Sequence, residues 1–287
     1  MGKKLHFIFN PTSGRARFNS LLRLATAVRS RGSKVAISVT TCPGDATVLS
    51  RGSDAEIICA VGGDGTVREV AEGLLGSQKI FTFLPMGTVN LLAAEVGLQN
   101  GSAHILRGVE FTHFSTFYPA RVNDRTFVVT ASVGFDADVV ASIDLRLKRR
   151  IGKGAYILAA IRRFWSFSPE RITVRIDGVN HHCGGAIIAN GQFYAGRFVC
   201  APKARVTNSQ LYACLMQVTT RKDLLRYVCA LAIGRFDKTR GIDIIEGKEI
   251  SILNPGKPIQ ADGDIVCDSP ATISSIPSDG IKLLSSV

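Results

Sequence analysis

The stretch that decides the fold is Ile57-Ile58-Cys59-Ala60-Val61-Gly62-Gly63-Asp64-Gly65-Thr66-Val67-Arg68-Glu69-Val70. It begins as a continuous, partly β-branched apolar run, which is typical of a strand buried on both faces of a parallel sheet. Glycines end the run, and apolar residues then recur at helical spacing, at Val67, Val70, Ala71, Leu74 and Leu75. The stretch therefore predicts a strand, a glycine turn and a helix.

Such a turn presents free backbone N–H groups and the positive end of a helix dipole, which together bind anions and most often phosphate. Gly62, Gly63 and Gly65 lack a Cβ, so phosphate oxygens can approach the backbone closely. Asp64 would repel phosphates unless it handles a metal ion or a proton. A tight turn without a ligand explains the glycines equally well, and the spacing fits neither a Walker A loop nor a dinucleotide fingerprint. Neighbouring loops must decide.

The first part of the chain alternates strands with helices, which predicts a parallel sheet covered on both faces. We expect strands at 5–9, 35–39, 57–61 and 80–84, and helices at 18–31, 46–51, after Asp64 and from Leu91. Ligands of such sheets bind where loops leave the carboxyl ends of the strands. Four loops leave those ends and should converge in space; they carry Asn10, Thr40, Asp64 and Thr88.

The pattern changes near residue 114 to short strands and hairpin-type turns, such as Asn123-Asp124 and Asp177-Gly178. Strands are expected at 117–122, 126–132, 171–176, 183–189, 211–218 and 249–253, with helical stretches at 137–164 and 223–233. The second part is therefore a mostly antiparallel β domain. The expected fold class is α/β plus β, with domains at 1–113 and 114–287.

The chain of 287 residues carries a formal charge of +12, which implies an anionic partner such as a nucleotide, nucleic acid or an acidic membrane surface. Its seven cysteines are scattered, without a Cys-x-x-Cys pair, and indicate buried free thiols in a reducing cytosol rather than zinc ligands. No signal-peptide core or membrane span is evident. We expect a cytoplasmic protein whose membrane contact is peripheral, at the inner face.

The stretch 137–164 places basic residues beside aromatic and aliphatic ones. Its cations are Arg146, Lys148, Arg149, Arg150, Lys153, Arg162 and Arg163, and its apolar neighbours are Tyr156, Ile157, Leu158, Phe164 and Trp165. A solvated helix face and a surface that docks on anionic lipid explain this pattern about equally well.

Taken together, the motifs resemble the diacylglycerol kinase catalytic-domain family, soluble bacterial lipid kinases related to sphingosine and ceramide kinases. They occur in the family's order over nearly the whole chain: Asn10-Pro11-Thr12-Ser13-Gly14, Thr40 with Gly44-Asp45-Ala46, Gly62-Gly63-Asp64-Gly65-Thr66, Pro85-Met86-Gly87-Thr88-Val89-Asn90, Val133-Gly134-Phe135-Asp136-Ala137, Ala201-Pro202-Lys203-Ala204 and Ala261-Asp262-Gly263-Asp264. The glycine-rich motif alone is shared with NAD kinases and phosphofructokinases.

The resemblance implies a doubly wound, NAD kinase-like first domain, a β-sandwich second domain, and ATP with Mg²⁺ in the interdomain cleft. The residues it implies for the nucleotide are Asn10, Thr40, Gly62, Gly63, Asp64, Gly65, Thr66, Val67, Arg68, Gly87, Thr88 and Asn90. Gly62 to Arg68 would wrap the phosphates, Thr40 and Thr88 would offer hydroxyls, and Asn10 would shape the phosphate end of the pocket.

The resemblance implies two candidate catalytic carboxylates. Asp64 would organise the metal or accept the proton of the lipid hydroxyl, and Asp264 would be the base of the bacterial branch. An alcohol is a poor nucleophile that needs a positioned carboxylate, and the migrating phosphoryl group needs N–H donors and cations. Without the other motifs, Asp262-Gly263-Asp264 would be interpreted as a simple turn.

Three departures from the family pattern bear on activity. The implied metal site falls on Arg205, Asn208 and Gln210, and Asn208-Ser209 replaces the usual Asp-Gly, so the site should be weaker or absent. Asp264 replaces a common Glu and is shorter by roughly 1.5 Å, a shift that can cost about a hundredfold in rate. Arg197 is either a surface residue or a cation for phosphate or a lipid head group.

We therefore expect an ATP- and Mg²⁺-dependent lipid kinase, with diacylglycerol or a close relative as acceptor and ceramide or a sphingoid base second. The alternatives are a catalytically weak lipid- or nucleotide-binding protein, which Asn208 and Asp264 motivate, and an NAD kinase, against which the motifs after residue 80 argue. The expected partners are a lipid substrate, an anionic membrane surface and a second copy of the chain in a homodimer. Nucleic acid would explain the charge but none of the loops.

Overall fold

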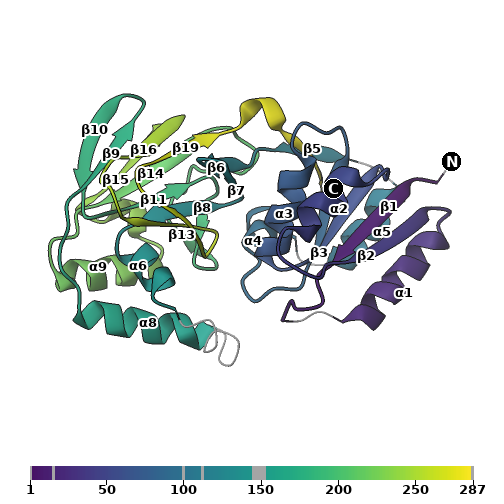
Figure 1. Ribbon diagram of the computed structural model, residues 1–287, viewed down its shortest axis with the longest axis horizontal. Helices are drawn as coiled ribbons and strands as arrows, with labels where there is room; N and C mark the ends of the chain where they lie inside the picture. Colours follow the sequence, from purple (N-terminus) through teal and green to yellow (C-terminus); the bar gives the residue numbers. More distant parts are fainter. Residues whose placement is uncertain (1, 15–16, 99–100, 111–112, 144–152, 286–287) are drawn as a thin grey trace. The chain divides into compact units, whose positions relative to one another are not determined.

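The computed structural model describes residues 2–14, 17–98, 101–110, 113–143 and 153–285. The chain divides into two compact units, one made of Met1–Pro119 with Ile276–Val287 and the other of Ala120–Ser275 (Figure 1). Each unit has an apolar core of its own.

The first unit contains a six-stranded sheet in the order β2-β1-β3-β4-β20-β5. Neighbouring strands pair in parallel, except that β5 runs antiparallel to β20. The strands are β1 (Lys4–Phe9), β2 (Lys34–Val39), β3 (Ile57–Gly62), β4 (Ile80–Pro85), β5 (Phe114–Phe117) and β20 (Ile281–Leu284). All six residues of β3 are buried, which requires cover on both faces of the sheet, as its apolar run predicts.

The helices of this unit are α1 (Phe18–Arg29), α2 (Asp45–Gly52), α3 (Asp64–Leu74), α4 (Leu91–Glu95) and α5 (Gly101–Glu110), with the 3₁₀ helix η2 (Pro277–Asp279). The apolar face of α1 packs on β1 and β3 in a cluster that α5 joins through Ile105. Helices α2 and α3 pack closely at Gly73, where an added Cβ would lie 2.0 Å from Ser50 Oγ. This parallel, helix-covered sheet confirms the predicted α/β architecture.

The second unit consists of two antiparallel sheets, in the orders β10-β9-β16-β19-β6-β7 and β15-β14-β11-β8-β17-β18, and a small β12–β13 hairpin. Strands of both sheets contribute to one apolar cluster, so the unit is a β-sandwich. The strands are β6 (Ala120–Val122), β7 (Arg125–Phe127), β8 (Thr130–Val133), β9 (Ile172–Ile176), β10 (Val179–Cys183), β11 (Gly185–Ala189), β12 (Phe193–Tyr194), β13 (Phe198–Val199), β14 (Leu211–Met216), β15 (Ile242–Gly247), β16 (Glu249–Ile252), β17 (Pro258–Ala261), β18 (Asp264–Asp268) and β19 (Ala271–Ser275).

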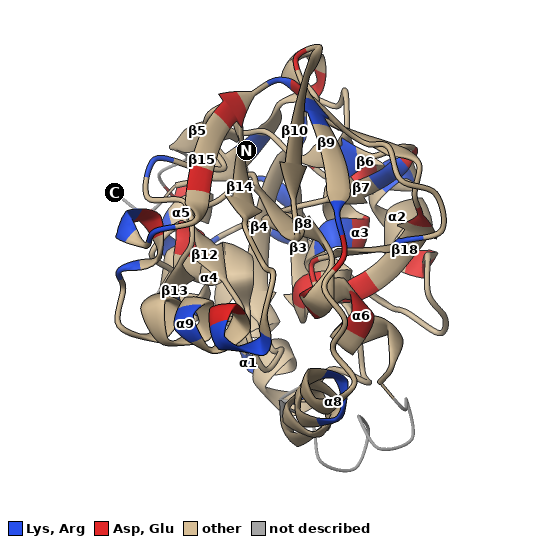
Figure 2. Cartoon of the chain, turned by 90° about the vertical axis from the view of Figure 1, so that its left-hand side faces the viewer, with Lys and Arg blue, Asp and Glu red and all other residues tan. Residues whose placement is uncertain are grey.

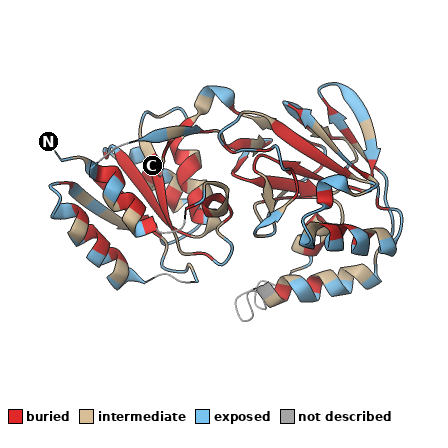
Figure 3. Ribbon diagram, turned by 180° about the vertical axis from the view of Figure 1, so that it is seen from behind, coloured by how far each residue is buried: buried red, intermediate tan, exposed pale blue. Residues whose placement is uncertain are grey.

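The outer face of the second sheet is covered by helix α9 (Arg221–Ala232) and the 3₁₀ helix η1 (Phe236–Lys238), through Leu224, Tyr227 and Phe236. Helices α6 (Phe135–Ala141) and α8 (Lys153–Trp165) complete the unit. Thr220 and Asp223 form a reciprocal capping box at the start of α9, which explains why that helix begins there. In Figure 3 the strands inside each unit are largely buried, whereas α8 and α9 alternate buried and exposed residues.

The division of the chain differs from the expected boundary between residues 113 and 114. Both β5 and the C-terminal β20 pair within the first sheet, and the change of unit comes at Pro119. The expected strand at 117–122 is therefore two strands, β5 and β6, in different units. Proline lacks the N–H that a continuous ladder needs, which explains the break.

Other expectations are met at their turns. The Asn123 and Asp177-Gly178 positions have positive φ and close the β6–β7 and β9–β10 hairpins. The expected helix at 137–164 corresponds to α6 and α8, and its middle, including Arg146, Lys148, Arg149 and Arg150, lies outside the described residues. All seven cysteines are free, and Cys59, Cys183, Cys200 and Cys214 are buried. Within the described residues, no helix is both long and apolar enough to cross a membrane.

Candidate functional site

The first candidate site lies at the carboxyl edge of the parallel sheet. Because β2, β1, β3 and β4 are adjacent and parallel, the loops that follow them leave the same edge. The backbone continues this pairing beyond the strands, since Asn10 N donates to Val61 O at 2.9 Å and Met86 N to Gly62 O at 2.7 Å. The fold therefore brings the loops after β1, β3 and β4 side by side.

Side chains join the loop after β1 to the glycine turn after β3. Asn10 Nδ2 donates to Thr66 Oγ1 at 3.0 Å, and Gly63 N donates to Ser13 Oγ at 3.2 Å. Asn10 Oδ1 accepts from Thr12 N at 2.9 Å, which shapes its own loop. Asn10 and Thr66 are thus brought together as expected, and their direct role is to hold the two loops to each other.

The glycines at this edge differ in what they are needed for. An added Cβ at Gly62 would lie 2.4 Å from Thr66 Oγ1, and one at Gly87 would lie 2.7 Å from Gly63 Cα. Gly62 makes room for the Thr66 side chain, and Gly87 allows the turns after β3 and β4 to touch. A Cβ at Gly65 would meet no protein atom within 4 Å, so Gly65 borders open space. Gly65 is the glycine whose small size leaves room for a ligand.

The start of α3 keeps N–H groups available for an anion. Its N-cap is Gly63, whose lack of a side chain leaves no cap for the first turn. The first N–H groups of a helix have no partner within the helix, and together with the helix dipole they bind phosphate well. Thr66 and Val67 are buried, and Val67 N already donates to Gly63 O at 3.0 Å, whereas Gly65 is exposed.

Asp64 connects the turn after β3 to the start of α4. Its Oδ1 accepts from Leu91 N at 2.6 Å and its Oδ2 from Asn90 N at 2.9 Å. Asn90 has a positive φ and its amide bonds both N and O of Gly87 at 2.9 Å. The carboxylate is therefore stabilised by a helix N-terminus, a role for Asp64 that the sequence did not indicate.

The loop after β2 is ordered by two acidic residues, Asp45 and Glu69, to which the sequence analysis assigned no role. Asp45 accepts from Thr41 N at 2.7 Å and Cys42 N at 3.0 Å, and these bonds hold the pKa of its carboxyl well below its usual range. Glu69 of α3 accepts from Gly44 N at 3.0 Å and so caps α2. The position of an Asp four residues after Thr41 was the sequence signal that could have indicated these hydrogen bonds. Thr40 itself is buried, and Thr88 is exposed on the loop after β4.

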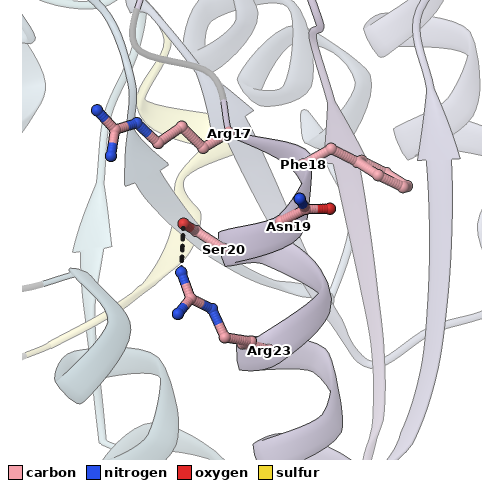
Figure 4. Close-up of a pocket in the computed structure, with 5 residues that line it drawn as sticks. All are labelled: Arg17, Phe18, Asn19, Ser20 and Arg23. Carbon is pink, nitrogen blue, oxygen red and sulfur yellow. Dashed lines mark hydrogen bonds between the residues drawn. The ribbon is translucent and has the colours of Figure 1, made fainter.

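A cavity of about 410 Å³ lies at the start of α1. It is lined by Arg17, Phe18, Asn19, Ser20 and Arg23, and Arg23 Nη2 donates to Ser20 Oγ at 3.3 Å (Figure 4). Two guanidinium groups beside one hollow favour anionic ligands over cationic ones. The sequence analysis did not single out these residues.

In the second unit, the Asp262-Gly263 turn joins β17 to β18, and both residues have positive φ. Asp262 is structural: its carboxylate accepts from Val128 N at 2.6 Å, Val129 N at 3.0 Å and Thr130 N at 3.1 Å. Asp264 opens β18 and is exposed. The turn thus leaves Asp264 accessible to solvent.

The loop expected to hold a metal is instead braced by a side chain. Arg205 Nη1 donates to Pro202 O at 2.9 Å and to Ala204 O at 2.7 Å, and Asn208 N donates to Arg205 O at 2.9 Å. The loop carbonyls are therefore already bonded to a cation and to an amide. Among the described residues, no group of three or more His, Cys, Asp or Glu side chains is placed so that it could hold a metal ion. Arg205 thus has a structural role in this loop, and the metal site expected at Arg205, Asn208 and Gln210 stays a prediction.

Comparison with known proteins follows the same two-part division. Residues 4–115 match the family model of the diacylglycerol kinase catalytic domain, and residues 129–284 match that of the YegS C-terminal NAD kinase beta sandwich-like domain. The chain belongs to the diacylglycerol kinase catalytic-domain family. Its named relatives make this a family of lipid kinases.

Two relatives and one solved structure illustrate the likeness. A Bacillus subtilis diacylglycerol kinase is 29% identical over 185 residues, which are 61% of this chain and 60% of that protein, so the match covers less than two thirds of its length. A probable YegS-like lipid kinase of Klebsiella pneumoniae is 29% identical over 69% of this chain and 68% of its own. The structure of a putative diacylglycerol kinase from Bacillus anthracis has a TM-score of 0.81 at 20% identity, over 99% of this chain and 96% of that one, which shows the fold.

Two of the residues that the sequence analysis contrasted with the family pattern, Arg197 and Asn208, lie in the second unit. Arg197 is exposed in the turn between β12 and β13, beside Gly196, which has a positive φ. Asn208 is exposed, and its backbone N–H bonds Arg205 as described. The loop around Asn208 is therefore held by hydrogen bonds among its own residues.

Proposed function

We propose that this protein is an ATP-dependent kinase that transfers the γ-phosphate to a lipid hydroxyl. Diacylglycerol is the first acceptor proposed, and ceramide or a sphingoid base is the second. The observation that carries the proposal is the hydrogen-bonded edge of the first unit, where the turns after β1, β3 and β4 hold one another around the exposed Gly65, in a chain of a lipid kinase family.

The nucleotide phosphates are proposed to lie at the start of α3. The first-turn N–H groups of this helix and the space beside Gly65 suit a group with several anionic oxygens. Arg68, partly exposed one turn further along α3, adds a cation. Mg²⁺ enters this proposal only as the counter-ion of ATP, where it would neutralise phosphate charge.

Asp264 is proposed as the general base. Its carboxylate takes the proton of the lipid hydroxyl as that oxygen forms a bond to the γ-phosphorus. The bond from the γ-phosphorus to the bridging oxygen breaks, and ADP leaves with the electron pair. An exposed carboxylate at the beginning of a strand suits this role because a substrate can reach it.

The lipid is proposed to come from a membrane that contacts α8. This helix exposes Ile157 (63%), Ile161 (51%) and Trp165 (68%), which are spaced one helical turn apart. Arg162 on α8 is exposed, and Figure 2 shows further Lys and Arg residues on α9. Arg163 is engaged instead, in an ion pair with Asp138 at 2.7 Å. An apolar stripe with flanking cations suits an anionic bilayer interface.

Transfer of label from γ-labelled ATP to a panel of vesicle-borne lipids tests the proposal. We expect labelled phosphatidic acid from diacylglycerol, with the Asp264→Asn variant lowering kcat by at least about a hundredfold. Asp268→Asn is the matched control, because Asp268 is exposed on the same strand. Absence of labelled product from every lipid would overturn the proposal in favour of a binding protein, and phosphorylation of NAD without lipid would overturn it in favour of an NAD kinase.

A further inference from the structure

Asp136, at the start of α6, carries a carboxyl group that the proposed reaction does not use. Tyr194 OH donates to Asp136 Oδ2 at 2.6 Å, and Ser132 Oγ donates to the same oxygen. The residue as a whole is half-buried, but its Oδ1 is buried and has no hydrogen-bond partner within the described parts of the chain. Two hydroxyls from two different strands thus converge on one carboxyl oxygen in the interior.

The network continues from Ser132 to the turn before Asp264. Gln260 Nε2 donates to Ser132 Oγ at 2.6 Å, and Gly263 N donates to Gln260 Oε1 at 2.9 Å. Ser132 and Gln260 are fully or almost fully buried, with 0% and 3% of their surface exposed. A continuous series of buried and partly buried hydrogen bonds therefore leads from Tyr194 through Asp136 to Gly263, the residue that precedes Asp264.

The two halves of this turn are held by different parts of the unit. Asp262 is bonded to the backbone N–H groups of residues 128–130, which follow β7 and include the first residue of β8. Gly263 is bonded through Gln260 and Ser132 to Asp136 on α6 and to Tyr194 on β12. Gly263 is itself conformationally permissive, so the two attachments are what restrict the turn to the conformation with positive φ.

An apolar side chain at position 136 would fill the same space without accepting these bonds. It would leave the hydroxyls of Ser132 and Tyr194 without their acceptor in the interior, and Ser132 would be free to rotate away from Gln260. The bond from Gln260 to Gly263 would then lose the contact that orients the amide. The Asp136 carboxylate is thus the acceptor that both the Ser132 and the Tyr194 hydroxyl need.

We propose that Asp136 is a positioning residue that holds the Asp262–Gly263–Asp264 turn in one conformation and thereby orients Asp264. The inference rests on the proposed function in that Asp264 is taken as the base that receives the acceptor's proton. Asp136 acts only through Ser132, Gln260 and Gly263, and it touches no reacting atom. Tyr194, on the β12–β13 hairpin that also carries Arg197, donates to the same carboxyl oxygen as Ser132.

Four variants of the full-length protein test this inference. Asp136→Leu removes the acceptor and replaces it with a side chain of similar size. Ser132→Ala removes the hydroxyl that links Asp136 to Gln260, with little loss of side-chain volume. Asp136→Asn keeps an acceptor oxygen and is the conservative rescue. Tyr227→Phe is the matched control, because Tyr227 OH bonds Gln217 O and Gly241 O elsewhere in the same unit.

Amide hydrogen exchange at Gly263 is the first readout, and it does not depend on catalysis. We expect exchange at Gly263 to be at least about tenfold faster in Asp136→Leu and Ser132→Ala and unchanged in Asp136→Asn and Tyr227→Phe. Unchanged exchange in a folded Ser132→Ala protein would overturn the inference, even if Asp136→Leu does not fold.

Kinetics are the second readout. Asp136→Leu and Ser132→Ala should lower kcat by about ten- to a hundredfold while the KM for ATP stays within about twofold, because misplacing a base affects the chemical step. Asp136→Asn should restore kcat. Equal losses in Asp136→Asn and Asp136→Leu would overturn the positioning role. If the wild-type protein phosphorylates no lipid, the proposed function fails. Faster exchange at Gly263 in Asp136→Leu and Ser132→Ala would still show that Asp136 holds the turn in place.

Discussion

The Asp64 carboxylate accepts a hydrogen bond from the backbone N–H of Leu91 at 2.6 Å, so the first residue of α3 caps the first turn of α4. Its second oxygen bonds the N–H of Asn90 at 2.9 Å. The glycine turn after β3 and the loop after β4 are therefore fixed to each other by one side chain. Asp64 therefore has this structural role in addition to any role in phosphoryl transfer.

We expect Asp64→Asn to impair both stability and turnover. An asparagine turns an NH₂ group toward one of the two backbone N–H donors, so one hydrogen bond is lost and a buried donor is left unpaired. The free energy of unfolding should fall by about 1–3 kcal/mol, and kcat should fall by at least about a hundredfold. Urea denaturation and the lipid kinase assay measure the two effects. A variant with wild-type turnover would remove Asp64 from the mechanism.

Two glycine variants separate packing from ligand binding at the same edge. In Gly87→Ala the new Cβ would lie 2.7 Å from Gly63 Cα and 2.8 Å from Asn90 Oδ1, so the protein should be destabilised by about 1–3 kcal/mol. In Gly65→Ala the Cβ meets no protein atom within 4 Å, so stability should not fall.

Gly65→Ala should nevertheless weaken ATP binding, because the methyl group occupies the space proposed for phosphate oxygens. Titration of each variant with ATP, followed by thermal shift, gives the measurement. If Gly65→Ala binds ATP as tightly as the wild type, the phosphates do not lie against this residue.

Removal of divalent cations should leave the fold of the second unit unchanged. The loop carbonyls of Pro202 and Ala204 are bonded by Arg205, which supplies the positive charge that a metal would otherwise bring. In the absence of nucleotide, Tm should be the same in EDTA and in Mg²⁺.

Arg205→Met should lower stability by about 1 kcal/mol, since two hydrogen bonds at a largely exposed side chain are lost. Arg197→Met is the control, because Arg197 is an exposed arginine of the same unit. A marked drop of Tm on chelation in the wild type would show that this unit does hold a divalent cation.

The pH dependence of stability should report on Asp136. Burial raises the pKa of its carboxyl above the ordinary value of 3.8, although hydrogen bonds from Ser132 and Tyr194 oppose the shift. The folded state therefore binds this proton more tightly than the unfolded state does. The resulting stability is present below pH 3.8 and is lost as the pH rises through the folded-state pKa.

Asp136→Asn cannot titrate at this position, so it serves as the reference. The wild type should become progressively less stable relative to Asp136→Asn as the pH rises from about 4 to neutrality. Other titrating groups, such as Asp45, cancel in this comparison. Urea denaturation of both proteins at several pH values measures the difference, and parallel pH curves would contradict a raised pKa.

Local patterns were sufficient to predict most of the first unit. The apolar run 57–61 required a strand covered on both faces, and the alternation of strands and helices required parallel neighbours, so the loops carrying Asn10, Asp64 and Gly87 had to leave one edge. The motifs also identified the family, because their order along the chain survives without any three-dimensional information. At Asp262-Gly263 the sequence left a simple turn as the alternative to a catalytic role, and the structure has a turn with positive φ there.

Only the tertiary structure decided which partner each polar side chain takes. Asp64 is a cap for α4 because the sheet brings Leu91 beside it, 27 positions along the chain. The return of β20 to the first sheet and the chain from Tyr194 through Asp136 to Gly263 join residues that are far apart in sequence. Periodicity and turn chemistry act over a few residues, whereas a hydrogen bond needs two groups within about 3 Å. That proximity is a property of the folded chain.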